Sequence, residues 1–160
     1  MKMKHLKNLF LAILVLNLVS CSDDDDSNGN GNFDSTDVTA LTSAVSNATW
    51  RITQFIDDGQ DETSDFDGVI FTFNANGSID VEDGMDTFTG TWTVELDDSD
   101  YDDDDDLDEL EFEISFSLSN DFDDLSEDWY VIEYSTNRLR LREDDDDDDD
   151  DDLLTFEIIQ

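Results

Sequence analysis

From residue 49 to the C-terminus, apolar side chains alternate with polar ones in a series of short runs. Phe88, Gly90, Trp92, Val94 and Leu96 alternate with threonines and a glutamate, and residues 110–118 repeat the same period of two. Such alternation is typical of antiparallel strands that place one face in a core and the other in water. It predicts eight strands, at about residues 49–56, 68–74, 78–82, 87–96, 110–118, 129–134, 138–142 and 153–159.

The turn-forming residues between these runs favour an all-β fold built from hairpins. Asn76-Gly77 and Asp83-Gly84 suit tight turns, because these residue types tolerate a positive φ. The chain has no proline to interrupt a ladder. Eight sequential antiparallel strands predict an up-and-down barrel, which leaves no open edge. A small β-sandwich would satisfy the same pattern and stays open as an alternative.

One segment before the strands has a helical period. Val38, Leu41 and Val45 fall on one face of a short helix over residues 38–47, with Asp37 or Thr36 as the expected N-cap. The preceding residues 22–37 are almost free of apolar side chains, so we expect a disordered acidic tether.

The N-terminus has the layout of a secretory leader. Three lysines precede an apolar stretch over residues 9–16, and Leu18-Val19-Ser20 leads to Cys21, the only cysteine of the chain. The apolar stretch is shorter than the roughly 20 residues that span a bilayer. We therefore expect a leader over 1–20, a tether over 21–37 and a barrel domain over 38–160.

The residues around the cleavage point resemble the signals of bacterial lipoproteins. Leu18-Val19-Ser20-Cys21 resembles a lipobox, which implies that Cys21 is lipidated and anchors the mature chain in a membrane. An ordinary cleaved leader with a chance cysteine is the alternative. The acidic residues that follow Cys21 resemble the signal that exports lipoproteins to the outer face of the outer membrane. A solvated acidic linker is the alternative interpretation, because it has the same composition. The residues of this export signal are Ser22, Asp23, Asp24, Asp25 and Asp26.

Charge narrows the range of partners. The whole chain carries a formal charge of −39, and without residues 1–20 it keeps four arginines against 46 acids, which gives 4 − 46 = −42. A charge of this sign argues against nucleic acid and anionic lipid as electrostatic partners. It favours cations, basic partners or simple solubility.

The side chains of the mature chain argue against an enzyme. Residues 22–160 contain no histidine, lysine or cysteine, so a Ser-His or Cys-His nucleophile and a lysine Schiff base are excluded. Carboxylates alone suit calcium rather than zinc or copper. No other cofactor is expected.

Two aspartate-rich loops are the calcium candidates. Asp98, Asp100, Asp102 and Glu109 match positions one, three, five and twelve of an EF-hand loop, but Asp103 replaces its glycine and no helices flank it. Solvated charge runs are the competing interpretation. The second candidate loop contains Asp144, Asp146 and Asp148.

Several short motifs, taken in order, resemble a known family. They are Ala48-Thr49-Trp50, Phe71-Thr72-Phe73-Asn74-Ala75-Asn76-Gly77, Gly90-Thr91-Trp92, Asp128-Trp129-Tyr130-Val131, Leu139-Arg140-Leu141 and Leu154-Thr155-Phe156. With this order and spacing, residues 41–160 resemble the lipocalin-like domain of small lipoproteins of Bacteroidota-type bacteria. The first motif departs from the pattern, because it lacks the glycine that usually precedes x-Trp. The aspartate insertions depart from it as well.

The resemblance implies a surface lipoprotein, lipid-anchored in the outer membrane, whose barrel binds a small apolar ligand. The alternative is a non-enzymatic structural or interaction protein, whose aromatic side chains simply fill the barrel and whose acidic loops bind calcium. The candidate interior residues are Trp50, Phe71, Phe73, Phe88, Trp92, Phe112, Phe116 and Trp129.

Overall fold

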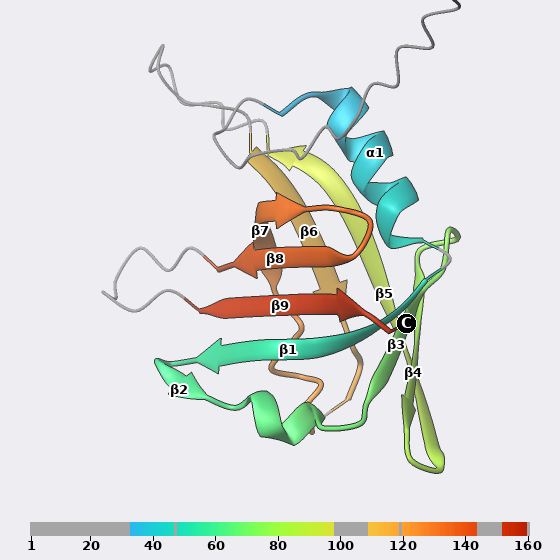
Figure 1. The fold of residues 1–160 in the computed structure, drawn as a ribbon, viewed down its shortest axis with the longest axis vertical. Helices are drawn as coiled ribbons and strands as arrows, with labels where there is room; N and C mark the ends of the chain where they lie inside the picture. Colours follow the sequence, from blue (N-terminus) through green and yellow to red (C-terminus); the bar gives the residue numbers. More distant parts are fainter. Residues whose placement is uncertain (1–32, 47, 98–108, 119, 144–151, 160) are drawn as a thin grey trace, which may run out of the picture.

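A computed structural model describes residues 33–46, 48–97, 109–118, 120–143 and 152–159. Its main feature is an eight-stranded antiparallel barrel with one α-helix beside it (Figure 1). The eight strands agree with the predicted ones to within a few residues. They are β1 (Thr49–Asp57), β3 (Ile70–Phe73), β4 (Ser78–Asp83), β5 (Asp86–Asp97), β6 (Glu109–Ser115), β7 (Asp128–Tyr134), β8 (Arg138–Arg142) and β9 (Leu153–Ile158).

The barrel closes between its first and last strands. Each main strand pairs antiparallel with the next one along the chain, and β1 also pairs with β9 from Trp50 opposite Ile158 to Ile56 opposite Leu153. This closure confirms the up-and-down barrel and excludes the sandwich. Two register shifts, between Ile52 and Gln54 in β1 and between Val131 and Glu133 in β7, interrupt the ladders.

The connection from β1 to β3 is more ordered than the loop we expected. It contains the short strand β2 (Gln60–Asp61), which pairs with the end of β1, and the 3-10 helix η1 (Thr63–Phe66). Strand β6 ends at Ser115, three residues before the predicted end at residue 118. There the backbone N–H of Phe116 donates to the Ser126 hydroxyl, so it has a side-chain partner in place of a ladder bond.

The helix α1 spans Ser35–Val45 and begins three residues earlier than predicted. Its N-cap is Asp34, neither Asp37 nor Thr36, because the Asp34 carboxylate accepts from Thr36 N–H at 2.6 Å while Asp37 accepts from Asp34 N–H at 2.9 Å. The periodicity places the start of the helix at its first apolar position, Val38, whereas the polar capping box extends the helix three residues further upstream. With Phe33 also buried, the folded part includes the last residues of the segment predicted as a tether.

The apolar face of α1 packs on the barrel as predicted. Leu41 and Val45 are buried, and Val38 is partly buried against the same core. The Trp50 indole donates to the carbonyl of Val45 at 3.0 Å, and the Tyr134 hydroxyl donates to the Asp37 carboxylate at 3.1 Å. The helix is therefore tied to the start of β1 and the end of β7, at one end of the barrel.

Candidate functional site: the aromatic interior and the acidic ladder

The structure brings the predicted interior residues together. Each comes from an inward position of a strand or lies just beyond one, and seven of the eight side chains are buried. Phe88 is the exception, because it is half-buried at the edge of the same core. The eight residues therefore belong to one packed core.

These rings meet one another across the barrel. The Phe73 ring on β3 lies 5.6 Å from the Phe112 ring on β6, centroid to centroid, although the two strands are three positions apart among the eight. Phe55 on β1 and Trp129 on β7, also three positions apart, lie at 6.5 Å. Phe73 further contacts Trp92 at 5.6 Å and Phe156 at 5.4 Å. Edge-to-face and offset pairs at such distances are the normal packing of aromatic cores.

Two phenylalanines from connecting segments cover the end of the barrel opposite α1. Phe66 belongs to η1, and Phe122 lies between β6 and β7. The Phe122 ring lies 5.9 Å from Phe66, 6.2 Å from Phe71, 5.0 Å from Phe88 and 5.5 Å from Phe116. Both side chains are buried, at 3% and 4% exposure.

The candidate set missed these two residues. Each is a single aromatic residue between aspartates, in Asp65-Phe66-Asp67 and Asp121-Phe122-Asp123, within segments that resemble solvated acidic loops. The sequence signal that could have identified them is the isolated phenylalanine itself. Exposing a large apolar ring to water is unfavourable, so a single phenylalanine among acids indicates a side chain that packs on the core.

The polar groups of the interior are satisfied by the fold itself. The indole N–H of Trp92 donates to the carbonyl of Asn74 at 3.0 Å, and that of Trp129 to the carbonyl of Leu125 at 3.2 Å. Within the described residues, no buried side-chain nitrogen or oxygen lacks a hydrogen-bond partner. The interior therefore offers a ligand no unpaired side-chain polar group from this part of the chain.

The outer face of β5, β6 and β7 carries a line of carboxylates that we call the acidic ladder. Its three register pairs all join like charges: Asp97 with Glu109, Glu95 with Glu111, and Glu113 with Asp128. Like charges directly opposite each other destabilise a sheet. Partial burial, followed by the charges of Asp128, Asp97, Glu95 and Glu113, raises the pKa of Glu111 above its usual value.

One arginine, Arg142, offsets part of the repulsion between the carboxylates of the acidic ladder. Arg142 Nη2 lies 3.1 Å from Glu109 Oε1, and its guanidinium lies 5.2 Å from the centre of the Tyr130 ring. Burial, followed by the negative charge of Asp97, raises the pKa of Tyr130. The sequence contained these acids, but their opposition depends on the register between strands.

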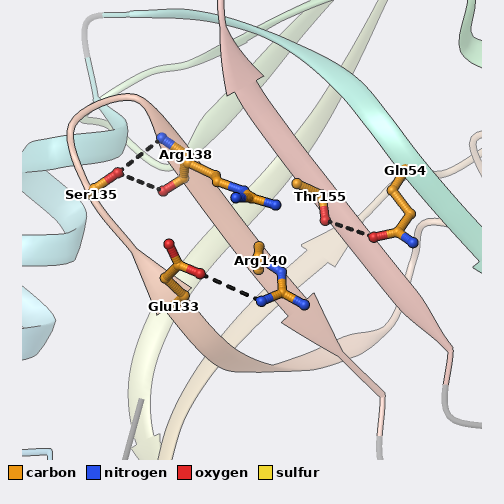
Figure 2. Close-up of polar contacts among 6 residues, drawn as sticks. All are labelled: Gln54, Glu133, Ser135, Arg138, Arg140 and Thr155. Atoms are coloured by element: carbon orange, nitrogen blue, oxygen red, sulfur yellow. Dashed lines mark hydrogen bonds and ion pairs between the residues drawn. The ribbon is translucent and has the colours of Figure 1, made fainter. Parts of the chain in front are cut away.

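The remaining arginines lie on the outer face of β8 and β1. Figure 2 shows Arg140 paired with Glu133, at 3.4 Å, and Thr155 donating to Gln54 on β1, also at 3.4 Å. Arg51 on β1 faces Glu157 on β9 at 4.0 Å. Because these side chains are at least one-third exposed, each pair contributes little stability, on the order of 0–1 kcal/mol.

A second carboxyl group with a shifted pKa lies where β1 ends. The backbone N–H of Asp58, the residue after Asp57, donates to Asp152 Oδ1 at 2.9 Å. Burial, followed by the charges of Asp152 and Glu62, raises the pKa of Asp57 to about 6.

Most of the predicted metal and anchor residues lie outside the described residues. Of the metal candidates only Glu109 is described, and its carboxylate pairs with Arg142. In the described ranges, no group of three or more acidic, histidine or cysteine side chains is placed to hold a metal ion. The undescribed candidates are Cys21, Ser22, Asp23, Asp24, Asp25, Asp26, Asp98, Asp100, Asp102, Asp144, Asp146 and Asp148.

Comparison with known proteins adds no assignment. No protein-family model matches the chain, and no curated protein matches it. Over the part of the chain that is described, no helix is long and apolar enough to cross a membrane.

Proposed function

We propose that this chain is a lipid-anchored lipoprotein of the outer membrane whose packed, non-enzymatic barrel carries an acidic surface toward cations or basic partners. The observation that carries this proposal is the contact between rings across the barrel. Phe73 and Phe112 meet from strands three positions apart, as do Phe55 and Trp129. Rings in contact at this spacing occupy the space that an apolar ligand would need.

The acidic ladder supports the second part of the proposal. Three like-charged pairs in register work against the stability of the sheet, and an arrangement that costs stability is common where a surface has a role of its own. Carboxylates of this density favour calcium or a basic protein surface. The proposal needs no catalytic group.

Binding of a small apolar ligand, which the lipocalin-like resemblance implies, is the weaker candidate. A barrel of this kind hosts many unrelated functions, so the fold alone identifies no ligand. A ligand that entered through the end covered by Phe66 and Phe122 would have to displace Phe122, whose ring contacts four others.

Uptake of benzene and of an environment-sensitive dye, followed by native mass spectrometry and fluorescence, separates the two candidates. We expect no saturable uptake by the unmodified chain. The Phe122→Ala variant removes a buried ring and leaves an apolar cavity, which should bind benzene and so prove that the assay detects a site of this size. Saturable uptake by the unmodified chain would reject the packed-barrel proposal.

The anchor is tested separately through Cys21. The Cys21→Ser variant should lose labelling by radioactive palmitate and leave the membrane fraction, whereas a Ser20→Ala control should keep both. A Cys21→Ser protein that still carries palmitate would show that the anchor lies elsewhere.

Calorimetry with calcium in a high-sodium background tests the acidic surface. A specific site on the acidic ladder gives saturable heat that disappears in the Glu95→Gln, Glu111→Gln variant, and a site in the aspartate-rich segment gives heat that disappears when the aspartates at 144–152 are replaced by serine. Heat equal to that of the sodium background would reduce this part of the proposal to general counter-ion association.

A further inference from the structure

Met85 lies at the tip of the β4–β5 hairpin with its side chain fully exposed, at 101% of the reference area. The register pair Asp83 and Asp86 closes the turn, and Gly84 takes the positive φ of 61° that the turn requires. A Cβ built on Gly84 would meet nothing within 4 Å. The tip therefore stands clear of the described part of the molecule, and the fold gives Met85 no packing role.

Met85 is also chemically singular. The other two methionines, Met1 and Met3, lie in the predicted leader. The three tryptophans, which are the next most oxidisable side chains, are buried at 0%, 4% and 1% exposure. An exposed thioether reacts with two-electron oxidants, whereas buried side chains are shielded.

We propose that Met85 is the oxidation site of the folded domain and takes one oxygen atom from a neutral peroxide. The sulfur lone pair attacks one peroxide oxygen, the O–O bond breaks and an S–O bond forms. Sulfur loses two electrons, the second oxygen leaves as water after proton transfer, and the product is methionine sulfoxide. Exposed carboxylates at Glu82, Asp83 and Asp86 repel anionic oxidants, so hydrogen peroxide is the favoured reagent class.

The reaction changes the surface without changing the core. Sulfoxide formation disrupts a protein when the methionine is packed, because a polar group then replaces apolar contacts. At Met85 there are no such contacts to lose. Oxidation therefore makes the exposed Met85 side chain at the acidic hairpin tip polar while the barrel stays folded.

Titration of the full chain with hydrogen peroxide tests this site, with peptide mapping to separate Met85 from Met1 and Met3. We expect Met85 to gain one oxygen at about the rate of N-acetyl-methionine amide, within roughly threefold, before any tryptophan reacts. The melting temperature of the oxidised chain should match that of the unoxidised chain. The Met85→Leu variant, treated in the same way, should gain no oxygen in the folded domain.

Two results would overturn the proposal. A Met85 rate more than about tenfold below that of the free amide would show that the tip is shielded. A fall in melting temperature that Met85→Leu abolishes would show that the side chain is packed.

Discussion

Gly90 shows how directly the interior packing depends on single residues. It occupies an inward position of β5, opposite Ile79 of β4, and is buried. A Cβ added there would lie 2.6 Å from two carbons of the Phe116 ring and 2.8 Å from the carbonyl oxygen of Ser115. The ring of Phe116 therefore uses the space that the missing side chain leaves.

The Gly90→Ala substitution should destabilise the barrel through this overlap. Overpacking of a dense core costs about 1–3 kcal/mol, which chemical denaturation would report as a lower midpoint. Thr89→Ala, at the neighbouring outward position, is the matched control and should change the free energy of unfolding by less than about 0.5 kcal/mol. Equal stability of Gly90→Ala and the unmodified chain would mean that Phe116 moves aside freely.

The carboxyl pair of Asp57 and Asp152 should make stability depend on pH. Because the folded pKa of Asp57 is raised to about 6 from 3.8, the folded state binds its proton more tightly than the unfolded state does. Protonation of Asp57 therefore stabilises the fold fully at pH values below the pKa of the unfolded chain, near 3.8. This stabilisation is lost as the pH rises through the folded-state pKa of about 6.

The Asp57→Asn variant should remove this dependence. It should unfold at higher denaturant concentration than the unmodified chain at pH 7.5, and the difference should shrink as the pH falls to 4. Asp67→Asn, an exposed carboxylate of the same connection, serves as the control for a general loss of charge. A constant difference between Asp57→Asn and the unmodified chain at all pH values would contradict the prediction.

Among the elements, α1 depends most on its own cap. Asp34 and Asp37 satisfy each other's backbone donors, and the hydrogen bond from Thr36 N–H lowers the pKa of Asp34. A carboxylate with a lowered pKa in the folded state stabilises the fold at pH values above its pKa in the unfolded chain. This stabilisation is lost as the pH falls through the lowered pKa of the folded state. The cap should therefore weaken in acid, in the opposite sense to Asp57.

The Asp34→Ala substitution should loosen α1 without opening the barrel. Hydrogen exchange should accelerate at the first-turn amides of α1, because the orphan N–H groups lose their acceptor. The amides of β4 and β5 should exchange as before. The Ser35→Ala control, at an exposed first-turn position, should leave α1 unchanged; acceleration throughout the barrel in Asp34→Ala would show that α1 and the barrel unfold together.

For the whole molecule, the large negative net charge opposes folding. The formal charge of −42 without the leader repels itself in the compact state, and the acidic ladder concentrates part of it. The screening length falls from about 30 Å at 0.01 M salt to about 3 Å at 1 M. Salt should therefore stabilise this fold.

The melting temperature should rise by at least about 4 °C between 0.01 M and 1 M NaCl, the shift expected for roughly 1 kcal/mol in a small domain. A double variant, Glu95→Gln with Glu111→Gln, removes one like-charged pair and should show a smaller rise. Asp65→Asn with Asp67→Asn removes the same net charge from the η1 region and is the control. A melting temperature indifferent to salt in the unmodified chain would contradict this interpretation.

The local elements could be predicted from the order of residues alone. The period of two located all eight main strands, and the period of the apolar residues located α1, because both patterns depend only on which side of one element faces the core. The same logic identified the interior residues on strands, such as Phe73 and Trp129. The Asp-Gly and Asn-Gly turns followed from local backbone freedom alone.

Features that join distant segments became visible only in the folded barrel. The pairing of β1 with β9 chose the barrel over the sandwich, and the placement of Phe66 and Phe122 over one end completed the core. The opposition of Glu95 and Glu111 likewise depends on the relative register of β5 and β6. The periodicity of a strand shows which of its faces is buried, but not which residue of another strand lies opposite each position. The register between strands brings the aromatic rings into contact in the interior and places like charges opposite each other in the acidic ladder.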